Sequence, residues 1–207
     1  MRRPDSRVWV VTGPMGSGKS TVCRLLEQCC AAVLDADALS HRLLARHDEV
    51  HAGLRALFGE AVFGADGRPD RRLIGERVFA DPGLLGKLEA LLHPHVLSEL
   101  ADKAADWRAR GSGLLVMEVV LWFQLSQRPF AVDGVLLTWA PPERLVERVA
   151  ARSGLAAHDV ARRLAAQGDW ERWTAQADRV LNTDCDLAEL ERRVRVLLPA
   201  LLAAPAP

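Results

Sequence analysis

The fold is decided by the stretch Gly13-Pro14-Met15-Gly16-Ser17-Gly18-Lys19-Ser20-Thr21. It satisfies the pattern G-x-x-x-x-G-K-[ST], in which successive backbone N–H groups point at phosphate oxygens and the glycines permit the required backbone angles. Residues 8–11 before the stretch are apolar and mostly β-branched, as in a strand buried on both faces, and residues 20–30 after it carry apolar side chains at helical spacing. The order strand, glycine loop, helix predicts a phosphate site at the start of the helix.

The polar residues of this loop have separate expected roles. Lys19 would reach the β and γ phosphates of a nucleoside triphosphate, and the Ser20 hydroxyl would hold Mg²⁺. The other expected nucleotide contacts are Gly13, Met15, Gly16, Ser17, Gly18 and Thr21. An ordinary glycine turn is the alternative, whereas a dinucleotide-binding loop is disfavoured because G-x-G-x-x-G does not occur here.

Alternating strand and helix signals predict one α/β domain over residues 1–207, with a P-loop NTPase-type parallel sheet of about five strands flanked by helices. Further strand signals lie at residues 32–34, 114–117, 135–137 and 180–181. The core is expected at residues 7–47, 112–140 and 178–204. Residues from about 48 to 111 are expected to form a helical acceptor-binding insertion. Residues from about 141 to 177 are expected to form a helical lid, with helical stretches at 142–152 and 158–167 and a tryptophan-containing segment at 169–177. A last helix is predicted from about 187 to 202.

Composition excludes several classes of partner. Lys and Arg together number 27, as do Asp and Glu, so no overall basic field favours nucleic acid, and a small substrate fits better. The four cysteines form no C-x-x-C pair and are expected to be reduced thiols. No stretch approaches the roughly 20 apolar residues of a membrane span, and Arg2 and Arg3 are not followed by an apolar signal segment. We therefore expect a cytoplasmic protein without a membrane contact.

Two carboxylates lie where the second expected strand ends. Asp35 and Asp37 would share a face if that strand continued to Asp37, because side chains alternate along a strand. A kinase acting on a hydroxyl group needs a carboxylate near the acceptor. Asp37 is predicted to be the base, and Asp35 its support on the substrate side or a contact of the water shell of the metal. Helix capping by Asp37 is the alternative.

The expected lid supplies arginines for the charge of the transferred phosphoryl group. Arg148 and Arg152 are four residues apart and therefore lie on one face of a helix. A planar guanidinium can bridge two phosphate oxygens, so a closing lid could bring one of them onto the γ phosphate. Solvated surface arginines are the alternative, which is stronger for Arg162 and Arg163.

The chain resembles the dephospho-coenzyme A kinase family over nearly its whole length. The resemblance rests on the segments GPMGSGKST, VLDADALSHRL, DGRPDRRLIGERVFADPGLLGKLEALLHPHV, RVAARSG…RRLAAQ and ADRVLNTD. The first segment is common to many kinases, whereas the combination in this order is specific. The resemblance implies MgATP-dependent phosphorylation of the ribose 3′-hydroxyl of dephospho-coenzyme A, the last step of coenzyme A synthesis. ATP and dephospho-coenzyme A are then the expected partners of a monomer or weak homo-oligomer.

The resemblance also implies roles for single residues. Asp37 matches the proposed base, Arg148 and Arg152 match lid arginines, and His93-Pro94 matches a turn beside the acceptor site. Without the resemblance, His93-Pro94 would be interpreted as a helix break, because proline disfavours helix at the preceding residue.

Three arginines of the expected insertion could contact the phosphates of the acceptor. They are Arg71, Arg72 and Arg77. A solvated helix face explains them equally well.

Two segments depart from the family pattern. The usual Pro-Leu-Leu-Phe-Glu type run is Val120-Leu121-Trp122-Phe123-Gln124 here, so a proline and a carboxylate are missing, and the usual Asn-x-Gly is Asn182-Thr183-Asp184. These changes bear on acceptor identity and rate more than on ATP binding. A kinase of another small hydroxyl compound or nucleoside, or a nucleotide-binding module with little turnover, stays open as an alternative. Trp170 and Trp173 would either stack on adenine or fill gaps.

Overall fold

A computed structural model describes residues 6–110, 113–120, 122–125 and 128–203. The chain divides into two compact units, of which the first comprises Met1–Asp35 and Lys103–Pro207 and the second Ala36–Asp102. Within the described residues, no helix combines the length and the apolar character that a bilayer span requires.

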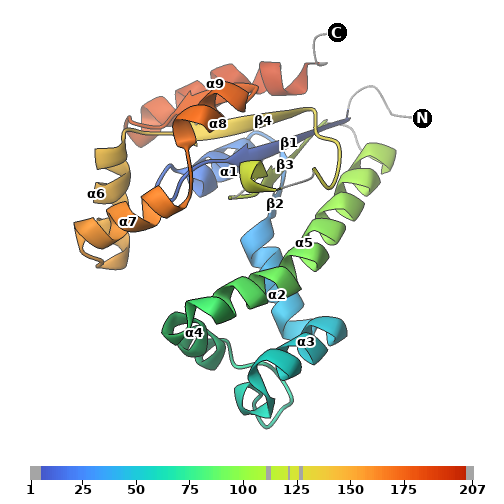
Figure 1. Cartoon of the computed structure of the whole chain (residues 1–207). Helices are drawn as coiled ribbons and strands as arrows, with labels where there is room; N and C mark the ends of the chain where they lie inside the picture. Colours follow the sequence, from blue (N-terminus) through green and yellow to red (C-terminus); the bar gives the residue numbers. More distant parts are fainter. Residues whose placement is uncertain (1–5, 111–112, 121, 126–127, 204–207) are drawn as a thin grey trace. The chain divides into compact units, whose positions relative to one another are not determined.

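The first unit contains a parallel sheet, which for the described residues has five strands (Figure 1). They are β1 (Ser6–Thr12), β2 (Ala32–Asp35), β3 (Gly113–Glu118), β4 (Gly134–Trp139) and β5 (Arg179–Asn182), in the order β2-β3-β1-β4-β5. The central strand β1 pairs with β3 from Ser6↔Gly113 to Val11↔Glu118, and with β4 from Trp9↔Gly134 onward. The predicted P-loop type of α/β sheet is confirmed, and the carboxyl ends of its strands meet at one edge.

Helices α1 (Lys19–Gln28) and α9 (Leu187–Leu202) cover one face of this sheet. The core on this face includes Trp9 and Val11 of β1, Val22 and Leu26 of α1, and Val194 of α9. On the opposite face of β1, Val8 and Val10 are completely buried as well. The central strand β1 is thus covered on both faces, as its continuous apolar sequence predicted.

A smaller cluster holds together the region predicted as a lid. Helices α6 (Pro142–Ser153) and α7 (Ala157–Ala166) lie where the sequence predicted helices, and α8 (Trp170–Gln176) lies in the tryptophan-containing segment of the expected lid. Leu145 and Val149 of α6 pack against Val160 and Leu164 of α7. Gly154 ends α6 with a φ of 69°, a left-handed conformation that lets the chain reverse toward α7.

The second unit is helical. It contains α2 (Ala36–Arg46), α3 (Asp48–Phe58), the 3₁₀ turn η1 (Glu60–Val62), α4 (Arg71–Ala80) and the first part of α5 (Pro82–Arg110). The turn or helix break predicted at His93-Pro94 is wrong, because Pro94 lies inside α5. Leu92 and Val96 on either side of this proline are both buried. Their packing offsets the hydrogen bond that proline removes, so tertiary contacts override the local preference.

Candidate active site

The phosphate-binding loop joins β1 to α1, and its glycines occupy positions that other residues would distort. Gly13 and Gly16 have φ angles of 151° and 80°, in the region that favours glycine. A Cβ atom at Gly13 would lie 2.5 Å from the carbonyl oxygen of Thr138, and one at Gly16 would lie 2.8 Å from Cγ2 of Val149. The loop therefore needs glycine both for its backbone angles and for its close contact with β4 and α6.

Lys19 is the first residue of α1 and only 7% exposed. Its Nζ donates hydrogen bonds to the carbonyl oxygens of Gly13 and Pro14, each at 3.0 Å. A buried ammonium group is unfavourable unless such partners replace water. The charge of Lys19 is thus held against the loop, at the positive end of α1, which is where the motif places it.

Ser20 and Glu118 bring two oxygen groups together beside the loop. The Ser20 hydroxyl donates to Oε1 of Glu118 at 2.9 Å, and Glu118 is the last residue of β3, 9% exposed. Hydroxyl and carboxylate oxygens are ligands that Mg²⁺ accepts, so these residues fit the ion expected at Ser20. The sequence interpretation missed Glu118, although an acid directly after an apolar run marks the carboxyl end of a buried strand.

Asp35 and Asp37 lie on different elements, so the condition under which they would share a strand face, a strand that continues to Asp37, is not met. β2 ends at Asp35, which is in register with Glu118 of β3, and α2 begins at Ala36. Asp37 is therefore in the first turn of α2, where a carboxylate favours the positive end of the helix. Asp35 lies at the sheet edge with Glu118, whereas the role of Asp37 as base stays a prediction.

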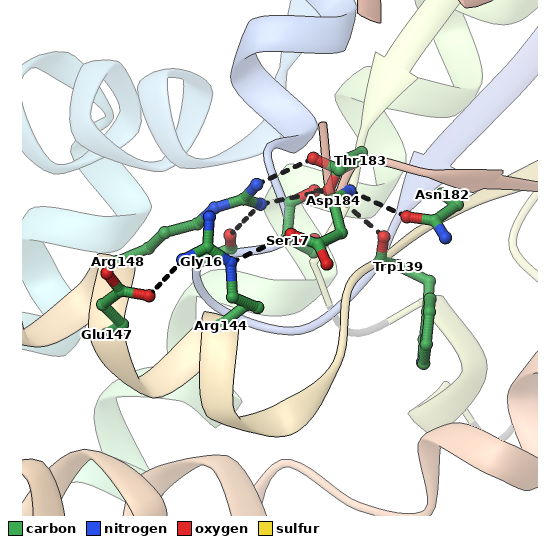
Figure 2. A network of polar contacts seen from close by, with 9 residues as sticks. All are labelled: Gly16, Ser17, Trp139, Arg144, Glu147, Arg148, Asn182, Thr183 and Asp184. Carbon is green, nitrogen blue, oxygen red and sulfur yellow. Dashed lines mark hydrogen bonds and ion pairs between the residues drawn. The ribbon is translucent and has the colours of Figure 1, made fainter. Parts of the chain in front are cut away.

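Arg148 joins α6 to the loop and to the segment after β5 (Figure 2). Its Nη2 donates to the carbonyl oxygen of Thr183 at 2.7 Å, and its Nη1 lies 3.2 Å from Oγ1 of Thr183 and 3.4 Å from the carbonyl oxygen of Gly16. Thr183 is buried, and its hydroxyl lies 2.9 Å from the carbonyl oxygen of Ser17. Of the two predicted lid arginines, Arg148 therefore contacts the loop, whereas Arg152 is exposed.

Asp184, where the sequence resemblance leads us to expect glycine, is accommodated without strain. Its carboxylate accepts a hydrogen bond from Nε of Arg144 at 2.9 Å, and its backbone N–H donates to Oδ1 of Asn182 at 2.7 Å (Figure 2). The hydrogen bond to Asp184 raises the pKa of the Arg144 guanidinium. Cys30 is the one non-glycine residue with a positive φ in the described part of the chain, so Asp184 does not adopt a backbone conformation that needs glycine.

Gln167 is a second residue that the sequence interpretation missed. Its Oε1 accepts a hydrogen bond from the backbone N–H of Met15 at 2.9 Å, and its carbonyl oxygen accepts one from the side chain of Gln124. Gln124 is part of the departing run 120–124, of which Leu121 lies outside the described residues. The chain thus uses the changed Gln124 to hold the end of α7, next to a loop N–H group that the motif assigns to phosphate.

The aromatic residues of this region pack on one another. Trp173 is 8% exposed, stacks on Phe123 with ring centroids 5.9 Å apart, and meets Trp170 edge-on at 4.4 Å. These contacts favour the gap-filling interpretation of Trp173 over stacking on adenine.

Cys23 lies on the same helix as Lys19, and its thiol is held in the protonated form. Burial raises the pKa of its thiol well above the ordinary range, and the nearby Glu118 raises it further. Like Cys29, Cys30 and Cys185, it is a free cysteine, as the sequence predicted.

The residues predicted to bind the acceptor lie in the second unit. Arg72 is exposed and pairs with Glu76 one turn along α4 at 2.7 Å, which agrees with a solvated helix face. Nη1 of Arg77 donates to the carbonyl oxygen of Phe58 at 2.7 Å and so fastens α4 to the end of α3. His93 is exposed on α5. Their contacts with an acceptor stay predictions.

The chain is similar to known proteins over most of its length. The family model described as dephospho-CoA kinase matches residues 8–189. A dephospho-CoA kinase from Thermus thermophilus is 40% identical over 191 residues, which are 92% of this chain and 90% of that protein. One from Chlorobium luteolum is 34% identical over 200 residues, 95% of this chain and 91% of that protein. The crystal structure of TT1252 from Thermus thermophilus superposes with a TM-score of 0.74 at 38% identity, covering 96% of this chain and 100% of that one.

Proposed function

Because the chain belongs to the dephospho-CoA kinase family, we propose that it transfers the γ-phosphoryl group of ATP to the ribose 3′-hydroxyl of dephospho-coenzyme A. The observation that carries the proposal is the site at the sheet edge, where a complete phosphate loop, the buried Lys19 and the Ser20–Glu118 pair lie together. A phosphate loop alone is shared by many nucleotide-binding proteins, so the acceptor is inferred from the family.

The loop and its two cations would hold the triphosphate. Backbone N–H groups of the loop face the β and γ phosphates, and Lys19 exchanges its hydrogen bonds with Gly13 and Pro14 for phosphate oxygens. Arg148 already contacts Gly16 of the loop, so its charge lies near the same oxygens. Both cations would stabilise the charge that spreads over the phosphoryl group in the transition state.

Ser20 and Glu118 would hold Mg²⁺ directly or through its water molecules, after the hydroxyl has released Glu118. At this position Ser20 and Glu118 would place a divalent charge beside the phosphates, which would neutralise part of their negative charge. Asp35 lies in register with Glu118 and could complete the water shell.

Asp37 would accept the proton of the attacking hydroxyl group. The 3′-oxygen forms a bond to the γ phosphorus, the bond from that phosphorus to the β–γ bridging oxygen breaks, and ADP leaves with the electron pair. The hydroxyl proton moves to the Asp37 carboxylate. Arg72, Arg77 and His93 are proposed to bind the acceptor.

The proposal is tested by ADP release with MgATP and dephospho-coenzyme A, beside a panel of nucleosides and sugars, with the mass of each product determined. We expect one added phosphate on dephospho-coenzyme A. Lys19→Ala should lower kcat by about 10²–10³-fold, because it removes a charge that acts in the transition state. The matched control is Lys87→Ala, which removes an exposed lysine of α5. Turnover of a panel compound instead of dephospho-coenzyme A would refute the acceptor, and full turnover by Lys19→Ala would refute the loop assignment.

The choice of base has its own comparison. Asp37→Asn should lower kcat by about 10²–10⁴-fold while ATP affinity changes little, because a base acts on the acceptor proton. Asp35→Asn is the comparison variant, with the same chemical change two residues away. If Asp35→Asn alone abolishes turnover, Asp37 is not the base.

A further inference from the structure

Two imidazoles and a carboxylate meet in the second unit, and none of the three has a role in the proposed phosphate transfer. His47 is the N-cap of α3, Glu49 lies in the first turn of α3, and His95 lies on α5. One potential ligand atom from each of them lies within 4.8 Å of those of the other two. The side chains come from two helices that are far apart in the sequence.

The geometry of this cluster is that of side chains converging on one point. The rings of His47 and His95 have centroids 4.5 Å apart at an interplanar angle of 51°, and Nδ1 of His95 lies 3.8 Å from Oε2 of Glu49. Nδ1 of His47 accepts a hydrogen bond from the backbone N–H of Val50 at 3.4 Å, which orients its ring at the start of α3. The His95 side chain is 24% exposed and that of Glu49 is 80% exposed, so water can reach one side of the cluster.

Imidazole nitrogen and carboxylate oxygen together suit late divalent transition metals such as Zn²⁺. Ligand atoms bound to Zn²⁺ at about 2.0–2.2 Å in a tetrahedron lie about 3.4 Å from one another. The ligand atoms of this cluster lie within 4.8 Å of one another, so they would have to approach one another by about 1 Å to bind the ion. The side chain of Glu49 is 80% exposed, so it can move toward the two imidazoles. Mg²⁺ prefers oxygen ligands only, so the ion that serves the nucleotide is a poor match for this site.

We propose that His47, Glu49 and His95 bind one divalent transition-metal ion, with Zn²⁺ the best match, and that water completes its coordination. The ion would link the start of α3 to α5 and so stabilise the second unit. The proposal does not depend on which acceptor the enzyme phosphorylates.

The test is metal titration of the full chain without nucleotide. Co²⁺ serves as the spectroscopic probe, because its ligand-field absorption reports nitrogen and oxygen ligands and a charge-transfer band reports thiolate. Zn²⁺ is then added to displace it. We expect one Co²⁺ per chain with nitrogen and oxygen ligands only, complete displacement by Zn²⁺, and a higher thermal midpoint with Zn²⁺.

Two variants remove one ligand each. His95→Gln and His47→Ser should each weaken Co²⁺ binding by more than about tenfold, since loss of a second-shell partner alone costs that much. Serine at position 47 still caps α3, so this variant keeps the helix start. The matched control His41→Gln removes an exposed histidine of α2 in the same unit and should bind as the wild type does.

Three results would overturn the proposal. They are wild-type Co²⁺ affinity in His95→Gln, a thiolate charge-transfer band that assigns the ion to cysteine, and a failure of the wild type to bind either ion. Circular dichroism of each variant shows whether the helices are intact. If His95→Gln were unfolded, His47→Ser alone would decide between these outcomes.

Discussion

Replacing Arg148 by methionine tests whether this arginine stabilises the fold or acts only in catalysis. Methionine keeps an unbranched apolar stem but removes all of the donors that Arg148 directs at Thr183 and Gly16. The sequence alone predicts that substitutions of Arg148 and Arg152 impair catalysis with little change in stability. The contacts in the structure change this expectation for Arg148.

The loss of stability can be estimated from these contacts. The bond from Nη2 of Arg148 to the carbonyl oxygen of Thr183, at 2.7 Å, is the short one, and a hydrogen bond to a charged group contributes about 1.5–3 kcal/mol net. The other two contacts, at 3.2 and 3.4 Å, are long, and the side chain is only half-buried, so they add little. We expect Arg148→Met to lose about 2–3 kcal/mol, or about 4–12 °C in Tm for a chain of this size.

Thermal unfolding by circular dichroism measures this difference, and ADP release on the same samples measures catalysis. The matched control is Arg152→Met, which removes an exposed guanidinium one turn along α6 and should leave Tm unchanged. If Arg148→Met unfolds at the wild-type temperature, or Arg152→Met unfolds as early as Arg148→Met does, then the contacts of Arg148 do not stabilise the fold and our reasoning fails.

Gly16→Ala should abolish ATP binding, as measured by calorimetry, because Gly16 has a φ of 80° and an added Cβ would lie 2.8 Å from a side chain of α6. The control is Gly154→Ala, at a residue with a φ of 69° and open space around it. This variant has backbone strain without a steric clash, and it should bind ATP. Equal affinity in both variants would contradict the packing argument. Hydrogen bonds from Arg192 and Arg193 lower the pKa of Glu189 from 4.5 to about 2. A carboxylate whose pKa is lowered by folding stabilises the folded state at pH values above 4.5, and this stabilisation is lost as the pH falls toward 2. The difference in urea midpoint between the wild type and Glu189→Gln should therefore shrink over that pH range. A constant difference would show that the carboxylate charge contributes nothing.

The fold could be predicted from the sequence because its signals are local. Each strand is a short apolar run between helical segments, and the loop motif fixes which strand and helix adjoin the phosphates. The expected strand at residues 8–11 and the last helix at about 187–202 correspond to Ser6–Thr12 and Leu187–Leu202. The two interpretations that fail, a turn at Pro94 and an extended Asp37, concern places where packing of distant residues or the start of a helix decides the backbone.

The candidate site was only partly predictable, because its support comes from contacts between distant residues. Ser20 and Glu118 are 98 residues apart, and Met15 and Gln167 are 152 apart. Nothing in the local sequence links either pair. Glu118 could have been found from its place at the end of an apolar run, since carboxyl ends of parallel strands collect at one edge. Gln167 offers no comparable signal.

The acid at position 184 shows how a departure from the family pattern can be absorbed. Arg144 and Arg148 are one turn apart on α6, and they bind the neighbouring residues Asp184 and Thr183. A glycine at position 184 would leave Arg144 without this partner, so the acid adds a second attachment of α6 to the segment that supports the loop. Because the carboxylate is engaged by Arg144, its expected effect is on how firmly α6 is held, and not on which hydroxyl group receives the phosphate. The substitution therefore gives no reason to expect an acceptor different from that of the family.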